Sequence, residues 1–213
     1  MPWLAVPWRR TNIRTELAQL FGVRGIPTLL LIDSNGHLIT YDARQDVTED
    51  PQGQNFPWKP KPVNVLTDRY IAKLYDYPAV ILFVDGEETE VQFAEAVLRP
   101  VAEAYYKKSN INLDTPDEDF LYGCDHELYL QFLIGVDSET ADIVRELTGI
   151  DDVVPLLVAV DISNRKVAVM EYGVEITEES VACFTEQFQK GELHTYSIVD
   201  KMSEQVNDKS ESR

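Results

Sequence analysis

Two stretches of the chain repeat the same order of features, and this repeat constrains the fold more than any other part of the sequence. The stretches ELAQLFGVRGIPTLLLIDSNGHLIT and DIVRELTGIDDVVPLLVAVDISNRKVAV each read as a helix, a glycine, a β-branched residue, a proline, an apolar run, an aspartate, a turn and a strand. Pro27 corresponds to Pro155, and Asp33 to Asp161. Continuous apolar runs of this kind are typical of strands that are buried on both faces. The repeat therefore predicts an α/β protein in which one supersecondary unit is used twice.

The prolines that precede these runs have two explanations. Proline lacks an N–H and is tolerated as the first residue of a strand. An X–Pro bond also adopts the cis form far more readily than other peptide bonds, so each proline could instead mark a cis bond at an active site. The recurrence of Pro27 as Pro155, in the same surroundings, favours a shared structural role.

A proline-rich spacer divides the chain. The stretch FPWKPKP at 56–62 contains alternate prolines, which favour an extended and semi-rigid polyproline II segment. Phe56 and Trp58 are expected to pack back on the residues before them. We expect a partial domain at 1–58, a linker at 59–62, a complete domain at 63–195 and a disordered tail at 196–213.

Helices and strands are expected to alternate on both sides of the spacer. Before it, the patterns predict strands at 2–6, 28–32 and 37–41 and a helix that begins at Thr11 or Asn12, whereas 42–55 is polar and lacks periodicity. After it, they predict strands at 63–66, 79–84, 129–134, 156–160 and 166–170, and helices at 67–75, 86–108, 139–147 and from 177 onward. Ser138 is expected to cap the helix at 139–147, Gly149 to end it, and Thr177 to open the last helix. This alternation predicts a parallel α/β layer.

The charge of the chain argues against two classes of partner. The sequence has 19 lysine and arginine residues against 37 aspartate and glutamate residues, a formal net charge of −18. A surface this acidic repels phosphate backbones and anionic lipids, so neither nucleic acid nor a membrane is expected as a direct partner. No apolar run reaches the roughly 20 residues of a membrane-spanning helix.

The two cysteines, Cys124 and Cys183, are too few for a disulfide framework, so we expect a reducing compartment. Cys124 stands near His126, but no second Cys or His lies at ligand spacing, and we interpret it as a loop cysteine without a metal or catalytic role. Cys183 is expected in the core or at its boundary. The acidic residues of 114–119 lack the pattern of a calcium loop. No motif indicates a cofactor.

The repeated unit resembles the thioredoxin fold, on the basis of IPTLLLID and VPLLVAVD with a helix before each and a hairpin after it. MPWLAVP, GIPTLLLID and FPWKPKPV, in that order, resemble the nucleoredoxin family, whose members are thioredoxin-like proteins of the cytosol and nucleus. The resemblance implies a cis proline before the third core strand, facing a Cys-x-x-Cys pair. It thereby assigns Ile26, Pro27 and Thr28 to an active-site shell, with Val154 and Pro155 as the structural cis-proline pair of the second domain.

The same resemblance implies that part of the first domain is missing. Residues 2–6 match its second core strand and 28–32 its third, but the strand between them, with its cysteine pair, has no counterpart in the sequence. Unpaired strand edges leave backbone groups unsatisfied, so 1–58 is not expected to fold stably alone. We expect the chain to begin inside a longer protein, as a fragment, an incomplete gene model or a short isoform. A strand supplied by a partner or a second copy is the alternative.

In the second domain a core strand runs into Asp85-Gly86-Glu87-Glu88, where the family's fold would present its redox pair. Because this turn has no thiol, we expect a domain without redox activity, similar to the binding modules of multidomain disulfide oxidoreductases. The resemblance implies that full-length members are protein-disulfide reductases that act on protein clients and restrain Wnt signalling by binding Dishevelled. We expect this chain to have no catalytic residue and no reductase activity. The alternative is an interaction scaffold that never had redox chemistry.

Overall fold

The computed structural model of the protein describes residues 4–23, 25–36, 38–40, 43–59, 61–109, 111 and 129–198. The chain forms two compact units that divide after Lys59, and each is described by itself. Cys124, His126, the acidic residues of 114–119 and the tail from 199 onward lie outside the described residues.

The second unit is built on one mixed sheet with the strand order β3-β5-β4-β6-β7-β8. β3, β5 and β4 are parallel to one another, whereas β6, β7 and β8 each pair antiparallel with the strand before them in this order. The expected parallel layer is therefore wrong for β6, β7 and β8, because tight connections such as the turn after β6 reverse the chain. The strands are β3 (Asn64–Val65), β4 (Ala79–Phe83), β5 (Gln131–Gly135), β6 (Leu156–Asp161), β7 (Lys166–Val169) and β8 (Tyr196–Ser197). This order gives β4 a hydrogen-bonded neighbour on each side.

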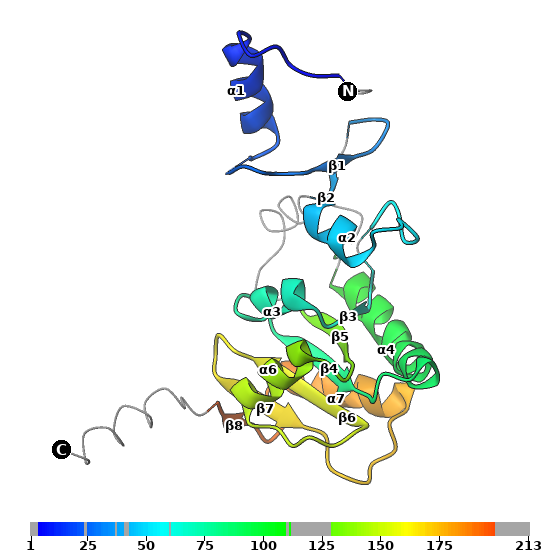
Figure 1. Ribbon diagram of the computed structural model, residues 1–213. Helices are drawn as coiled ribbons and strands as arrows, with labels where there is room; N and C mark the ends of the chain where they lie inside the picture. Colours follow the sequence, from blue (N-terminus) through cyan, green and yellow to red (C-terminus); the bar gives the residue numbers. More distant parts are fainter. Residues whose placement is uncertain are drawn as a thin grey trace, which may run out of the picture. The chain divides into compact units, whose positions relative to one another are not determined.

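Helices cover both faces of this sheet (Figure 1). They are α3 (Asp68–Leu74), α4 (Glu88–Lys108), α6 (Glu139–Thr148) and α7 (Glu178–Lys190). Along β4, Ala79, Ile81 and Phe83 belong to the apolar cluster that includes residues of α3 and α6. Val80 and Leu82 belong to the cluster that includes residues of α4 and α7. The run AVILF is continuously apolar because its side chains alternate between two buried faces.

The elements expected after the spacer are all present, with ends that differ by about two residues or less. Two helices have the predicted ends: the Ser138 hydroxyl accepts the Ala141 N–H at 3.2 Å, and Gly149 ends α6 with a φ of 72°. At α7, Thr177 and Ser180 form a reciprocal capping box. The prediction of a disordered tail from 196 is wrong for Tyr196–Ser197, because β8 pairs there with β7.

Tyr106 ties the end of α4 to the beginning of β5. Its hydroxyl donates to the carbonyl oxygen of Leu130 at 2.9 Å, and its ring lies 5.8 Å from that of Phe132 and 6.2 Å from that of Tyr129. Burial raises the pKa of Tyr106 well above its usual range, and the nearby Tyr129 adds to the shift. The phenol is therefore held in its protonated, donating form.

The first unit contains α1 (Thr11–Leu20), β1 (Leu31–Ile32), β2 (Leu38–Thr40) and α2 (Ala43–Glu49), with β1 and β2 antiparallel. The expected strand at 2–6 is wrong for 4–6, which is irregular, and β1 covers only the end of the strand expected at 28–32. The segment 42–55 was expected to be irregular but contains α2. A hydrogen bond of 3.1 Å from the Thr40 hydroxyl to the buried Asp46 carboxylate fixes this helix beside β2.

The described part of the first unit buries few side chains. α1 has no buried residue, Leu4 is 100% exposed and Ile26 is 95% exposed. Among the described residues β1 pairs with β2 alone, and a two-stranded sheet offers little support for a long strand or a two-faced core. The instability of 1–58 in isolation stays a prediction.

Asp50 organises the end of the first unit. Its carboxylate accepts hydrogen bonds from the backbone N–H of Asn55 at 2.6 Å and of Gln54 at 2.9 Å, and from Trp58 Nε1 at 3.0 Å. These hydrogen bonds lower the pKa of Asp50, and the bond from the Asn55 N–H has the largest effect. Trp58 therefore packs back on the preceding residues as predicted, whereas Phe56 is exposed.

Replacing Tyr106 by Phe should change how stability depends on alkaline pH. The raised pKa means that the folded state keeps the phenolic proton when the unfolded chain has lost it. The stabilisation is complete below the unfolded pKa of about 10 and is lost as the pH rises towards the folded pKa.

We expect Tyr106→Phe to be about 1 kcal/mol less stable at neutral pH and to lose stability less steeply above about pH 10. Urea unfolding at a series of pH values measures both, and equal alkaline slopes for the variant and the parent would contradict the assignment. Tyr75→Phe, at an exposed position, is the control.

Candidate functional site

One end of the second unit's sheet collects four chain segments. β4 and β5 are parallel and end together, with Phe83 opposite Gly135. β6 is antiparallel to β4, so it begins at the same end, with Leu156 opposite Phe83. The end of β7 also lies there, since the Met170 N–H donates to the carbonyl of Leu157 at 2.9 Å. The segments 84–88, 136–142, 150–155 and 170–177 therefore meet at this end of the sheet.

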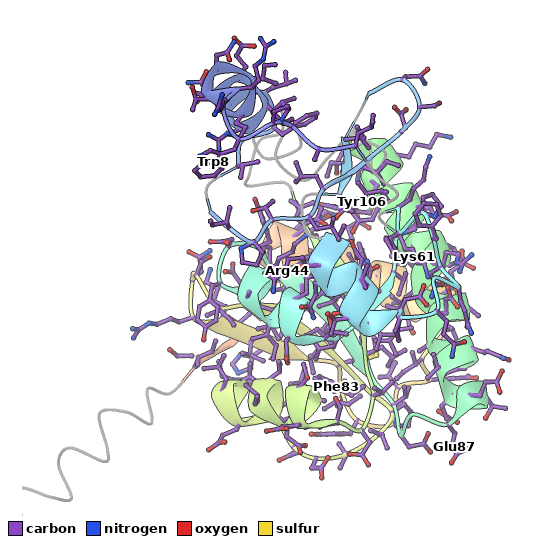
Figure 2. The ribbon with its side chains drawn as sticks, turned by 45° about the horizontal axis from the view of Figure 1, so that its top comes forward. Trp8, Arg44, Lys61, Phe83, Glu87 and Tyr106 are labelled. Atoms are coloured by element: carbon purple, nitrogen blue, oxygen red, sulfur yellow. The ribbon has the colours of Figure 1, made fainter. Side chains whose placement is uncertain are left out.

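The turn after β4 presents carboxylates at the beginning of α4. Asp85 Oδ1 accepts the Glu87 N–H at 3.0 Å, and Gly86 has a φ of 92°, a conformation that other residues adopt only with strain. The acidic Glu88 and Glu90 in the first turn complement the positive end of the helix dipole. Glu87 and Tyr106 lie at opposite ends of α4 (Figure 2). The turn and the first turn of α4 thus concentrate negative charge at this end of the sheet.

The loop before β6 carries the predicted proline of this unit. The Val154–Pro155 peptide bond is cis, and Val153, Val154 and Pro155 are exposed. The Asp151 carboxylate accepts the Tyr172 hydroxyl at 2.8 Å, which connects this loop to the segment after β7. That hydrogen bond raises the pKa of Tyr172.

A buried arginine, Arg145, holds the same loop from α6. Its guanidinium carbon lies 4.3 Å from the centroid of the Phe83 ring, and Nη2 donates to the Val153 carbonyl at 3.2 Å. Nη1 donates to the Asp151 carbonyl, and Nε lies 3.6 Å from the exposed Asp152 carboxylate. The ion pair with Asp152 contributes little to stability, because this carboxylate is exposed. Arg145 therefore stabilises the loop mainly through its hydrogen bonds to the two backbone carbonyls and its contact with the Phe83 ring.

The role of Arg145 was missed from the sequence, although a signal was present. Arg145 follows Ala141 and Val144 on the buried face of α6 and precedes Thr148 on it, all four with little exposure. An arginine on an otherwise buried helix face needs a partner inside the protein. The carbonyls of the proline loop are that partner.

Gly135 makes room for the ring under Arg145. A Cβ at this position would lie 2.4 Å from Cδ1 and 2.6 Å from Cε1 of Phe83. Phe83 itself is fully buried, so its ring has no free space into which it can move. The glycine is therefore required by the packing of the ring rather than by the backbone conformation.

The predicted site residues of the first unit lie at an exposed turn. The Ile26–Pro27 bond is cis, Thr28 Oγ1 donates to the Gly25 carbonyl at 2.5 Å, and Arg44 Nη1 donates to the Pro27 carbonyl at 3.3 Å. These residues belong to a different compact unit from Val154 and Pro155. Their assignment to an active-site shell stays a prediction. A third cis bond, Phe56–Pro57, was not expected.

The remaining candidate chemistry is sparse in the part of the chain that the structure describes. Cys183 is exposed on α7, which corrects its expected place in the core or at its boundary. No set of three or more His, Cys, Asp or Glu side chains is arranged to hold a metal ion among the described residues. Within those residues, no helix is both long and apolar enough to cross a membrane.

The order β3-β5-β4-β6-β7, with helices between the strands and Pro155 directly before β6, is that of a thioredoxin-like fold. No protein-family model matches the chain. Nucleoredoxins of Danio rerio and Homo sapiens are 34% and 35% identical to it over 194 and 189 residues, which cover 91% and 88% of this chain. The chain is therefore a homologue of the nucleoredoxins over about nine tenths of its own length.

The chain spans about two fifths of the length of these relatives, 42% and 40%. Tryparedoxin of Trypanosoma brucei brucei is 49% identical over 59 residues, 27% of this chain and 41% of the relative. A solved structure of the bb fragment of ERp72 aligns with a TM-score of 0.45 and 17% identity, over 84% of this chain and 74% of that one.

Removing the guanidinium of Arg145 should loosen the proline loop. We expect Arg145→Ala to lower the free energy of unfolding by about 2 kcal/mol, because charged hydrogen bonds and the contact with the Phe83 ring are lost. Arg145→Lys should recover only part of this, since an ammonium cannot bridge both carbonyls. Arg99→Ala, which breaks an exposed pair with Glu95, should cost less than about 0.5 kcal/mol. Denaturant unfolding measures all three, and equal losses for Arg145→Ala and Arg99→Ala would refute the role.

A methyl group at position 135 should be tolerated poorly. We expect Gly135→Ala to lower stability by about 1–3 kcal/mol through overpacking against Phe83. The double variant Gly135→Ala with Phe83→Leu should recover part of the loss, because the smaller side chain removes the clash. Thermal unfolding of the two single variants and of the double variant tests this prediction. Additive losses of stability from the two substitutions would contradict it.

Proposed function

We propose that this chain is a non-catalytic, protein-binding part of a nucleoredoxin-like thiol–disulfide oxidoreductase. The observation that carries the proposal is the turn Asp85-Gly86-Glu87-Glu88, which joins β4 to α4 at the end of the sheet where Pro155 also lies. A thioredoxin-like fold positions its redox chemistry at this place. Carboxylates and a glycine there suit recognition and not thiol exchange.

The chemistry of thiol exchange supports this proposal. The attacking species is a thiolate, which is stabilised by a helix N-terminus or by cationic neighbours. The sequence has two cysteines, and Cys183 lies within α7, beyond its first turn. Asp85 and Glu87 have the opposite charge from the neighbours that a thiolate needs. No thiol of the described residues is therefore placed as an attacking group at this end of the sheet.

The family supports further proposals about the whole protein. We propose that a full-length protein of this kind reduces protein disulfides through a Cys-x-x-Cys pair next to Ile26, Pro27 and Thr28. By the same resemblance, it would restrain Wnt signalling by binding Dishevelled and would work in the cytosol and nucleus. The net charge of −18 supports protein partners over nucleic acid or membranes.

An alternative proposal is a thioredoxin-like scaffold that never had redox chemistry. The sequence of the transcript upstream of Met1 distinguishes this scaffold from the oxidoreductase. An in-frame Cys-x-x-Cys some tens of codons upstream supports the oxidoreductase, whereas an in-frame stop codon just before Met1 supports the scaffold. Both proposals share the expectation that the chain itself does not reduce disulfides.

An insulin-reduction assay tests that shared expectation. With dithiothreitol as the reductant, we expect the chain to reduce insulin no faster than a control with Cys124→Ser, Cys183→Ser and Pro27→Ala. The physical reason is that the sequence contains no Cys-x-x-Cys pair to form and release a mixed disulfide. Turnover above that of the control would refute the proposal, and circular dichroism of both proteins checks that they share one fold.

A further inference from the structure

The charged side chains of the four described segments that meet at the site end of the second unit are all acidic. The segments 84–88, 136–142, 150–155 and 170–177, together with the adjoining Gly135, Leu156 and Glu178, contain no lysine, histidine or arginine. Their acidic residues are Asp85, Glu87, Glu88, Asp137, Glu139, Asp142, Asp151, Asp152, Glu171, Glu175 and Glu178. Segments this far apart in sequence meet only because the sheet brings them together.

Contacts between the segments show that they form one surface. The space beside Gly86 is bounded by Val136 Cβ and the Asp137 backbone, at 3.5 and 3.7 Å from an added Cβ. The Tyr172 hydroxyl reaches Asp151, and Arg145 holds the carbonyls of Asp151 and Val153. Arg145 is 8% exposed, so its charge is directed into the protein and leaves the surface acidic.

Two of the four acidic segments also carry exposed apolar side chains. Val153 is 42%, Val154 46%, Tyr172 62% and Val174 45% exposed. Val153 and Val154 precede β6, and Tyr172 and Val174 follow β7, so neighbouring strands present them side by side. We call this surface the acidic–apolar face, and we call the four apolar side chains its centre. Its rim is the set of acidic residues Asp85, Glu87, Asp137, Asp152, Glu171 and Glu175 of the same segments.

We propose that the acidic–apolar face binds a segment of a partner protein that has a short apolar centre flanked by lysine or arginine residues. The inference rests on the proposed function, because it names the chemistry of the partner that a non-catalytic unit would bind. An apolar centre inside a polar rim is the usual anatomy of a protein interface. The acidic rim attracts basic flanking residues and repels acidic ones. Burial of the apolar side chains of the centre (Val153, Val154, Tyr172 and Val174) supplies the part of the affinity that does not depend on charge.

Peptide binding to the full chain tests this inference. The probe is a fluorescein-labelled KKKVVVKKK peptide, compared with EEEVVVEEE and KKKSSSKKK by fluorescence anisotropy. We expect the first peptide to bind at least about tenfold more tightly than the acidic one and about threefold more tightly than the serine one. Raising NaCl from about 50 mM to about 500 mM should weaken binding severalfold, because the rim charges are exposed and are screened.

Matched variants locate the site. Tyr172→Ala and Glu171→Lys should each weaken binding about threefold or more. Tyr75→Ala and Glu103→Lys should leave it unchanged, since Tyr75 is similarly exposed at the opposite end of the sheet and Glu103 lies on α4. Thermal unfolding confirms that all four variants are folded.

Three outcomes would overturn the inference. Equal binding of KKKVVVKKK and KKKSSSKKK would mean that only general charge attraction acts. Equal effects of Glu171→Lys and Glu103→Lys would mean that no particular surface is used. A dimer of the chain in sedimentation that Glu171→Lys dissociates would make a second copy the occupant. Disulfide reduction in the insulin assay would refute the proposed function and would leave the peptide result intact.

Discussion

The pairing of β4 with β5 on one side and β6 on the other is the constraint on which the rest of the second unit depends. Ala79–Phe83 is buried along its whole length and has partners on both edges. Its register sets Phe83 opposite both Gly135 and Leu156. The turn after β4 and the proline loop before β6 are therefore neighbours because of backbone pairing, before any side chain of the site is considered.

From this pairing a chain of contacts leads outward to the surface. Gly135 has no side chain, so the Phe83 ring can lie against it, and the ring in turn supports the guanidinium of Arg145. The guanidinium then holds the carbonyls of Asp151 and Val153. Exposed residues such as Val153 and Val154 are thus held by groups in the core, which reduces the ordering cost when this surface binds a partner.

The sequence predicted the elements whose signals are local and missed those that depend on contacts between distant residues. The apolar runs of β4 and β6 and the helix ends at Ser138, Gly149 and Thr177 follow from neighbours in sequence, and all were predicted. The helix α2 was missed for a different reason, since 42–55 is polar and lacks an apolar periodicity. β8 depends on pairing with β7, which is distant in sequence. For the same reason the candidate site was predicted only at Pro155 and the Asp85 turn. Arg145 gains its role from carbonyls that only the folded loop presents.

Thiol exchange and the binding of a basic partner require opposite electrostatic potentials at this end of the sheet. A redox pair at the beginning of α4 needs positive potential, from N–H groups, the helix dipole or cations, so that a thiolate forms. The acidic–apolar face provides negative potential from four segments, and carboxylates near a thiol favour its protonated form. A cysteine introduced into the Asp85 turn would therefore form a thiolate less readily than one beside cationic neighbours. The negative potential instead favours a basic partner that binds without a covalent step, which is the class of partner proposed for this face.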